Sequence, residues 1–260
     1  MDFKYIRFKV TDAVAFITLN RPEKRNAFDD VLVEELKQAL THCAENDLIR
    51  ALVLKAEGKA FCAGADLAYL QRLQKFTYEE NLADSTALSE MFEMLYAHPK
   101  ITIAQVQGHA LAGGCGLATA CDFCFAAQEV QFGYTEVKIG FVPAIVMVFL
   151  TRKLGEGLAK RLLFTGALIS ADEAKTIGLI TDAVPLDTLE AFVTNFIENM
   201  IKTTSAEAQL LTKNMLQDVL DKTIYEGFRK AALVNAQARM TADCKKGITA
   251  FLNQEKITWS

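Results

Sequence analysis

The chain has 260 residues, of which 51% are hydrophobic and 23% charged, and only 4 are proline. This composition predicts one ordered α/β protein with a large core and excludes a chain that is disordered over long stretches. The formal net charge of −4 argues against the broad basic surface that nucleic acids require, so no nucleic-acid partner is expected. No apolar run reaches the roughly 18 residues that span a bilayer, so we expect no membrane partner and a cytoplasmic location.

The strands and helices of the first third are predicted from apolar patterning. Val14 to Leu19 indicates a strand, and residues 20–26 follow it as a turn-forming, basic loop. A helix is predicted from Asp29 or Asp30, because either side chain can cap it and apolar residues then recur on one face. The continuous apolar run Ala51 to Leu54 is typical of a strand that is buried on both faces.

The middle of the chain repeats a unit of strand, turn and helix. Residues 59–67 form a loop of small residues. A strand is predicted over Ile101 to Val106, followed by the glycine-rich segment 108–117, a helix over Gly114 to Ala120 and another strand over Phe123 to Ala126. We therefore expect helices to connect strands that lie near one another in the core.

The remainder of the chain reads as helical. Pro143 suits an early helical position, because its missing amide costs nothing there. Helices are predicted over Leu154 to Phe164 and Ala171 to Gly178, and Gly178 is a typical C-terminal stop. No convincing strand lies in the last third, so we divide the chain into a core over residues 1–185 and a helical C-terminal region over residues 186–260.

Six cysteines and three histidines are the residues that could form disulfides or hold a metal. Cys62, Cys115, Cys121 and Cys124 lie among apolar neighbours, which favours reduced, buried thiols. Cys121 and Cys124 form one C-x-x-C pair without a second pair, and the histidines are scattered. We therefore expect no metal site.

The glycine-rich segment and a downstream glutamate point to catalysis. Backbone amides at a helix start can hold a developing negative oxygen, and Gly113 stands at such a position. Glu136 lies twenty residues past Gly116, and a carboxylate beside such amides can move a proton. The small-residue loop 59–67 could supply a second amide.

Six motifs in order make the chain resemble the crotonase family, also called the enoyl-CoA hydratase/isomerase family. They are Asn20-Arg21-Pro22 with Asn26-Ala27, residues 60–67, Ala112 to Cys115, Ala120-Cys121-Asp122, Phe132-Gly133, and Glu136 to Gly140 through Pro143. This resemblance implies an α/β fold, a crotonase-like spiral of ββα units with a helical C-terminal region, that assembles as a homotrimer or homohexamer. It also implies an acyl-CoA substrate, whose CoA is carried in the thioester, and no further cofactor.

The resemblance assigns roles to individual residues. The oxyanion donors would be the backbone amides of Ala65 and Gly113, with Glu136 as the proton carrier. An apolar pocket, for which Phe132, Phe141 and Val142 are candidates, would raise the pKa of Glu136. Further substrate contacts are assigned to Lys24, Ala27, Ala63, Asp66, Leu67 and Gly114. Apart from the resemblance, a hydrophobic acyl pocket could draw on Leu70, Leu88, Phe92 and Phe141, although their helical spacing explains them equally well as core residues.

Other polar residues near these motifs can be explained without a catalytic role. Lys24 and Arg25 either meet the CoA phosphates or form a plain solvated turn. His109 and Tyr134 could supply a second polar group, but packing or hydrogen bonding is the simpler role for each. Asp66 is expected to secure its loop rather than to react.

One position departs from the family pattern. Gly116 stands where hydratases of this family have a first glutamate, so two-carboxylate activation of water is missing. Glycine there, together with Glu136 and the residues that follow it, resembles the bacterial methylglutaconyl-CoA hydratase branch of leucine degradation. The sequence therefore favours reversible hydration of a 2-enoyl-CoA. It leaves open an enoyl-CoA isomerase, a dehydratase of a branched acyl group on a carrier protein, and a non-catalytic acyl-CoA-binding protein.

Overall fold

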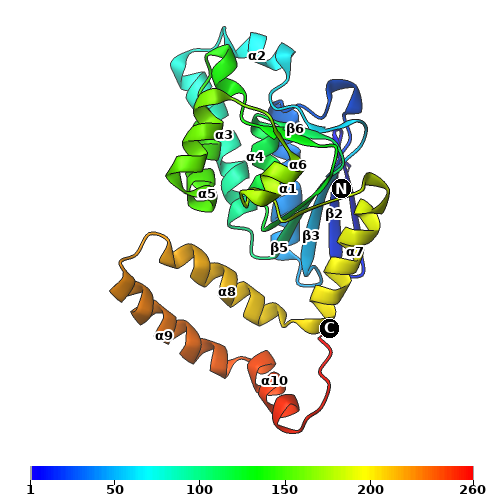
Figure 1. Cartoon of the computed structure of the whole chain (residues 1–260), viewed down its shortest axis with the longest axis vertical. Helices are drawn as coiled ribbons and strands as arrows, with labels where there is room; N and C mark the ends of the chain where they lie inside the picture. Colours follow the sequence, from blue (N-terminus) through cyan, green and yellow to red (C-terminus); the bar gives the residue numbers. More distant parts are fainter. Residues whose placement is uncertain (1, 260) are drawn as a thin grey trace.

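The structure is a computed structural model that describes residues 2–259, and two β-sheets form its framework (Figure 1). The larger sheet has the order β1-β2-β3-β5-β7-β10 and is parallel except for the β1–β2 pair. The smaller sheet has the order β4-β6-β8-β9, and only β9 pairs antiparallel. The strands are β1 (Ile6–Thr11), β2 (Val14–Leu19), β3 (Ala51–Ala56), β4 (Ala60–Cys62), β5 (Ile101–Val106), β6 (His109–Leu111), β7 (Phe123–Ala127), β8 (Gln131–Gly133), β9 (Ile169–Ser170) and β10 (Asp182–Val184).

Helices cover the sheets and then extend beyond them. Among them, α1 and α3 pack against each other, and α7 packs on β7 and β5. The α-helices are α1 (Asp30–Glu45), α2 (Leu67–Leu73), α3 (Tyr78–Tyr96), α4 (Gly113–Thr119), α5 (Ala144–Thr165), α6 (Ala171–Thr176), α7 (Leu186–Thr203), α8 (Ala206–Val219), α9 (Ile224–Met240) and α10 (Ala242–Leu252). Residues 2–259 also contain two 3-10 helices, η1 (Pro22–Lys24) and η2 (Glu136–Ile139). Mixed strands and helices in this order confirm the predicted α/β class.

The first predicted helix begins where its cap requires. Asp29 adopts an extended conformation and its Oδ1 accepts the amide hydrogen of Leu32 at 2.9 Å. The buried face of α1 then presents Leu32, Leu36 and Leu40 to the core. A capped, one-sided apolar pattern therefore gave both the start and the buried face of this helix.

The buried strand at residues 51–54 is central in the larger sheet. It becomes β3, which pairs in parallel with β2 on one side and β5 on the other. Its first four residues are all buried, as a parallel strand covered on both faces requires. The predicted strands at Val14, Ile101 and Phe123 are also confirmed, as β2, β5 and β7.

The helix predicted from Leu154 begins earlier than expected. In the structure α5 starts at Ala144, with Pro143 as the residue that precedes it rather than as an early helical residue. Gly155 interrupts the helix with φ 73° and ψ 163°. This break divides the apolar pattern, which is why the sequence revealed only the second part of α5.

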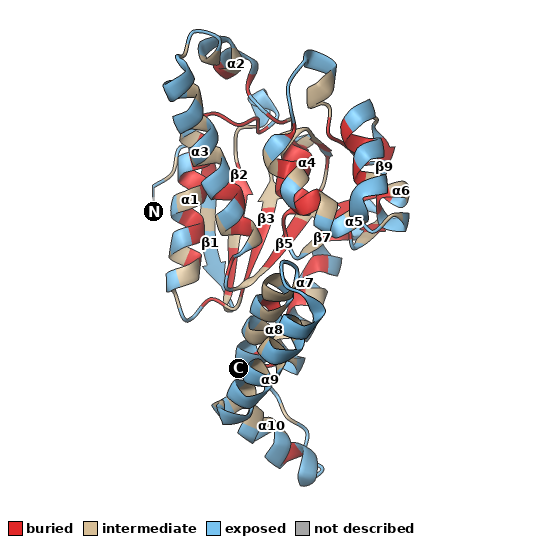
Figure 2. Cartoon of the chain, turned by 90° about the vertical axis from the view of Figure 1, so that its left-hand side faces the viewer, coloured by how far each residue is buried: buried red, intermediate tan, exposed pale blue. Residues whose placement is uncertain are grey.

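Helices α8, α9 and α10 form a C-terminal arm, residues 206–252, that projects away from the sheets (Figure 1). Figure 2 shows that buried residues concentrate in the body, whereas the arm is mostly exposed. The arm is tied to the body by polar groups: Lys213 Nζ lies 2.7 Å from Asp122 Oδ2, and Gln217 donates to the carbonyl of Tyr96 at 2.9 Å. Among the described helices, none combines the length and the apolar character needed to cross a membrane.

Candidate active site

The first predicted oxyanion donor, Ala65, lies in a loop that pairs with residue 28. Phe28 donates its amide hydrogen to the carbonyl of Gly64 at 2.7 Å, and Asp66 donates to the carbonyl of Phe28 at 2.8 Å. In this parallel bridge the two bonds use the residues on either side of Ala65, so the amide of Ala65 points away from Phe28. Ala65 is exposed, and its amide donates to no described protein group.

The second predicted donor, Gly113, is the first residue of α4. The preceding residue, Ala112, has φ 50° and ψ −129°, and its amide donates to the carbonyl of Gly133 at 2.7 Å. The first amides of a helix have no partner within the helix. Within residues 2–259 the amide of Gly113 likewise has no backbone acceptor, so it remains available to an external oxygen.

Two glycines bring the loops of Ala65 and Gly113 into contact. A Cβ atom on Gly64 would lie 2.8 Å from the Cβ of Ala112 and 3.5 Å from the amide nitrogen of Gly113. A Cβ on Gly114 would lie 2.2 Å from the carbonyl oxygen of Cys62. Only glycine permits both approaches, so the structure brings together the two loops that the sequence named as oxyanion donors.

Glu136 is the first residue of η2 and is half-buried. Burial raises the pKa of its carboxyl group above the ordinary value. The Oε2 atom is buried, and no group in the described part of the chain forms a hydrogen bond with it. The charge of Glu136 also helps to raise the pKa of Cys115, which lies two residues after Gly113 in α4, although burial of the thiol is the larger cause. Glu136 therefore lies within electrostatic reach of the helix that Gly113 begins.

The place of the missing first glutamate is filled by apolar side chains. A Cβ atom on Gly116 would lie 2.4 Å from Cγ1 of Val146 and 3.3 Å from the ring of Phe92. Phe92 is buried and stacks on Phe149, with ring centroids 5.9 Å apart. Without movement of Val146 there is no room for an acidic side chain at residue 116.

His109 and Tyr134, the candidates for a second polar group, form hydrogen bonds with other groups of the protein. The Tyr134 hydroxyl is buried and lies 2.8 Å from the Thr119 hydroxyl. His109 accepts the amide hydrogen of Gln131 through Nδ1 at 3.0 Å. Both side chains thus have the hydrogen-bonding role that was the simpler expectation for them.

The predicted CoA-binding residues lie on two adjoining loops. Ala63 donates to the carbonyl of Arg25 at 3.0 Å, and Ala27 donates to the carbonyl of Lys24 at 3.1 Å. Lys24 is exposed, and Leu67, the first residue of α2, is 79% exposed. Backbone hydrogen bonds thus join the segments that contain these residues, and Lys24 and Leu67 face solvent.

Asp66 and two residues without an assigned role secure these loops. Asp66 is buried and its Oδ1 accepts the amide hydrogens of Ala68 and Tyr69. Its other oxygen pairs with Arg21. Asn26 is fully buried and donates to two backbone carbonyls at 2.9 Å, those of Glu57 and Ala60. Sequence reasoning placed Arg21 in a basic loop, whereas its guanidinium is largely buried in ion pairs.

The apolar residues after Glu136 are more open than expected. Phe141 is 56% exposed and Val142 is 61% exposed, whereas Phe132 is fully buried in β8. The predicted rise in the pKa of Glu136 agrees with the structure. Phe141 and Val142, however, leave most of their surface open in the single chain, so they do not form the closed apolar wall that we expected.

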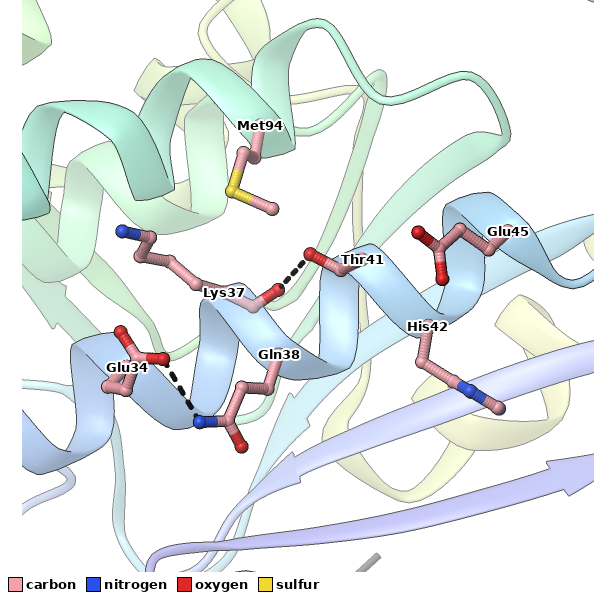
Figure 3. A pocket seen from close by; sticks show the side chains of 7 residues that line it. All are labelled: Glu34, Lys37, Gln38, Thr41, His42, Glu45 and Met94. Carbon is pink, nitrogen blue, oxygen red and sulfur yellow. Dashed lines mark hydrogen bonds between the residues drawn. The ribbon is translucent and has the colours of Figure 1, made fainter.

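A surface pocket on α1 lies apart from these residues (Figure 3). Its side chains interact with their neighbours: Lys37 pairs with Glu90 at 2.7 Å, and Gln38 donates to Glu34 at 3.0 Å. The lining residues are Glu34, Lys37, Gln38, Thr41, His42, Glu45 and Met94. None of the predicted catalytic or substrate-binding residues is among them, so the candidate active site lies elsewhere.

The cysteines do not suggest a second kind of site. Cys43, Cys62, Cys115, Cys121 and Cys124 are buried free thiols. Burial raises the pKa of Cys62 and Cys121 to about 12, which makes these thiols poor nucleophiles. Across residues 2–259, no three histidine, cysteine, aspartate or glutamate side chains gather as potential metal ligands.

Comparison with known proteins places the chain in a family. Residues 9–260 match the family model described as enoyl-CoA hydratase/isomerase. A protein of Thermus thermophilus with a provisional enoyl-CoA hydratase name is 44% identical over 241 residues, which are 93% of this chain and 95% of that protein. The crotonyl-CoA hydratase of Syntrophomonas wolfei is 33% identical over 261 residues, covering 100% of this chain and 99% of that protein.

A solved structure agrees with the sequence comparisons. The crystal structure of an enoyl-CoA hydratase from Shewanella pealeana superposes with a TM-score of 0.93 at 32% identity, covering 99% of this chain and 96% of that one. The family match spans nearly the whole chain, and the fold is shared with that structure. The chain therefore belongs to the enoyl-CoA hydratase/isomerase family, the crotonase family, and is an enzyme of that family.

Proposed function

We propose that the protein is a hydratase that adds water reversibly to the double bond of a 2-enoyl-CoA. The observation that carries this proposal is the half-buried Glu136, with a raised pKa and an unpartnered carboxylate oxygen, near the helix that begins at Gly113. In the proposed site the thioester oxygen accepts hydrogen bonds from the amides of Ala65 and Gly113. Removing one such donor typically costs about 3 to 4 kcal/mol.

The proposed reaction uses one carboxylate for both proton transfers. Glu136 takes a proton from water as the water oxygen bonds to Cβ of the substrate. The electron pair of the double bond moves toward the thioester, where the two amides stabilise the negative oxygen. The same glutamate then gives its proton to Cα, and the product carries hydroxyl on Cβ and hydrogen on Cα. CoA enters with the substrate, so the reaction needs no further cofactor.

A double-bond isomerase is the second candidate, and the surroundings of Gly116 favour it. Val146 and Phe92 occupy the space of a second acid, and a lone carboxylate can move a proton between Cα and Cγ without water. Incubation with crotonyl-CoA and with a 3-enoyl-CoA, followed by mass spectrometry, separates the two reactions. A product about 18 Da heavier, one water by elementary chemistry, supports hydration. Unchanged mass with new conjugated absorbance supports isomerisation and contradicts our proposal.

We propose 3-methylglutaconyl-CoA as one substrate to compare with crotonyl-CoA. The resemblance of residues 136–145 to the methylglutaconyl-CoA hydratase branch supports the branched acyl group. The apolar side chains of Val146 and Phe92 beside Gly116 support an uncharged acyl group, such as that of crotonyl-CoA. The ratio of kcat/KM for the two substrates decides between them, because an apolar pocket strongly disfavours a buried carboxylate.

We also propose that the protein assembles as a homotrimer or homohexamer. The support is the C-terminal arm, whose helix α9 has no buried residue. Large apolar side chains on the arm lie exposed in the single chain, including Leu216, Tyr225, Phe228, Leu233 and Phe251. Such a surface is typical of an interface between subunits. Light scattering after size-exclusion chromatography measures the assembly, and a monomeric mass would contradict the proposal.

A further inference from the structure

Arg21 joins the two acidic residues that follow Phe28 and Ala65 in the chain. Its Nη1 lies 2.7 Å from Oδ2 of Asp29, and its Nη2 lies 3.1 Å from Oδ2 of Asp66. The guanidinium also donates to the carbonyl of Ala27 at 3.3 Å. Only 11% of the arginine side chain is exposed, so this charge is directed inward and not toward the phosphates of a ligand in solution.

Both carboxylates have a second task that leaves one oxygen for Arg21. Oδ1 of Asp29 caps α1 through the amide of Leu32, and Oδ1 of Asp66 caps α2 through the amide of Ala68. The aspartates are 8% and 4% exposed. Buried carboxylates require a partner of opposite charge, and one planar guanidinium serves both, because its donors point in fixed directions.

The two ion pairs lie next to the β-bridge between Phe28 and Ala65, and this bridge sets the direction of the Ala65 amide. Asp29 follows Phe28 in the chain, Asp66 follows Ala65, and Phe28 forms backbone hydrogen bonds to the residues on either side of Ala65. The ring of Phe28 also lies 3.3 Å from the position of a Cβ on Gly113. The segment held by Arg21 therefore supports the loops of both proposed oxyanion donors.

We propose that Arg21 is a positioning residue: it holds Asp29 and Asp66 together and thereby aims the amide of Ala65 at the thioester oxygen. It does not touch the substrate. This inference rests on the proposed function, because it presumes that the amide of Ala65 binds that oxygen. Two different nitrogens of the guanidinium reach the two aspartates. A lysine keeps the positive charge but has one nitrogen and no planar fork, so Arg21→Lys separates this two-nitrogen bridge from the charge itself.

The test measures polarisation of the thioester directly. A 4-(dimethylamino)cinnamoyl thioester of CoA absorbs at longer wavelength when hydrogen bonds draw electron density toward its carbonyl oxygen. The probe is titrated into wild-type protein, Arg21→Lys and Asp29→Asn, and the wavelength shift at saturation is compared. Asp29→Asn retains a good helix cap while it weakens the ion pair. It also provides a second reading if Arg21→Lys fails to fold.

A matched control separates positioning from loss of stability. Lys213→Met breaks another ion pair, that of the buried Lys213 with the more exposed Asp122, which is 2.7 Å long and lies beyond the C-terminal end of α4. It should lower the melting temperature and retain the full wavelength shift of the bound probe.

The proposal predicts a specific pattern for the Arg21 variant. Arg21→Lys should bind the probe within about threefold of the wild-type Kd but give at most half of its wavelength shift. Its kcat for crotonyl-CoA should fall by about 10- to 100-fold with little change in KM, as misplacement of a catalytic donor predicts. Asp29→Asn should give an intermediate shift.

The contrary results are equally distinct. A full wavelength shift in folded Arg21→Lys, with a lowered melting temperature, would show that the ion pairs are only structural and would overturn the inference. If wild-type protein binds the probe without any shift, or does not bind it, the proposed oxyanion site itself fails, and the inference fails with it.

Discussion

Val146 occupies the space into which a side chain at Gly116 would project. The Cβ of any other residue at position 116 would lie 2.4 Å from Cγ1 of Val146, a distance that real Cβ atoms essentially never show. Val146 is 4% exposed and lies in the packed core with Phe92. Core packing therefore takes the place of the acid missing at residue 116, and Glu136 remains the one proposed proton carrier.

Restoring the acid at residue 116 should require removal of Val146. Gly116→Ala should destabilise the protein by roughly 1 to 3 kcal/mol, the usual cost of overpacking a core, and Gly116→Glu should cost more. Adding Val146→Ala to Gly116→Glu should recover part of that stability, measured by denaturant unfolding. Gly157→Ala is the control, since nothing lies within 4 Å of a Cβ there. Equal stability of Gly116→Ala and wild type would show that Val146 moves aside freely.

Glu136→Gln should reduce kcat by about 10²- to 10⁴-fold, the usual contribution of a general acid–base group. The glutamine retains the volume of the side chain but cannot accept a proton. Hydration of crotonyl-CoA, followed by the loss of enoyl absorbance, measures the effect. Glu129→Gln, on the exposed turn before β8, should leave the rate unchanged. An unaltered rate in Glu136→Gln would exclude Glu136 as the proton carrier.

The pH dependence of the wild-type rate should report the burial of Glu136. The carboxylate must be ionised to accept a proton from water, so the rate should fall as pH decreases through its pKa. Because burial raises this pKa, the midpoint of the acid limb of kcat/KM should lie above 4.5, the ordinary value for glutamate. A midpoint at or below 4.5 in a folded protein would contradict this assignment.

The same burial predicts a gain in stability when the charge is removed. Since the folded-state pKa of Glu136 is raised, its protonated form is favoured, and stability is lost as pH rises through that pKa. Glu136→Gln should therefore melt at a higher temperature than wild type at neutral pH. The difference should shrink as pH falls toward the ordinary glutamate pKa. A lower melting temperature at neutral pH would mean that the carboxylate has a stabilising partner.

Gly64→Ala should impair catalysis more than its backbone strain explains. Its φ of 85° costs alanine roughly 1 to 2 kcal/mol, and its Cβ would also lie 2.8 Å from the Cβ of Ala112. Pushing Ala112 away should move the amide of Gly113 and lower kcat. Gly178→Ala is the matched control, because its φ is 78° and nothing lies within 4 Å of its Cβ. Equal kcat values in the two variants would contradict this role of the contact.

Local patterns in the sequence determined several elements of the fold. The cap at Asp29 and the apolar face after it predicted α1, and the apolar run at residues 51–54 predicted β3. These signals are local because a cap acts within one turn and a buried strand is apolar along its own length. Patterning did not reveal the three-residue strands β4, β6, β8 and β10, since so short a segment has no measurable period.

The candidate site was also predicted only in part from the sequence. Motif resemblance named Ala65, Gly113 and Glu136 from the sequence, and the structure brings the loops of Ala65 and Gly113 into contact through Gly64. The raised pKa of Glu136 required burial, which the sequence predicted, but not through Phe141, which is 56% exposed. The residues that bury an acid can lie anywhere in the chain, so the sequence order does not show them.

The sequence by itself determined the family, the cap of α1 and the order of the loops that supply the proposed donors. Only the tertiary structure decided that Val146 fills the place beside Gly116 and that Arg21 joins Asp29 to Asp66. The physical reason is range: caps and apolar periods act between near neighbours in the chain. Close packing and buried ion pairs depend on atoms that meet only after the chain has folded.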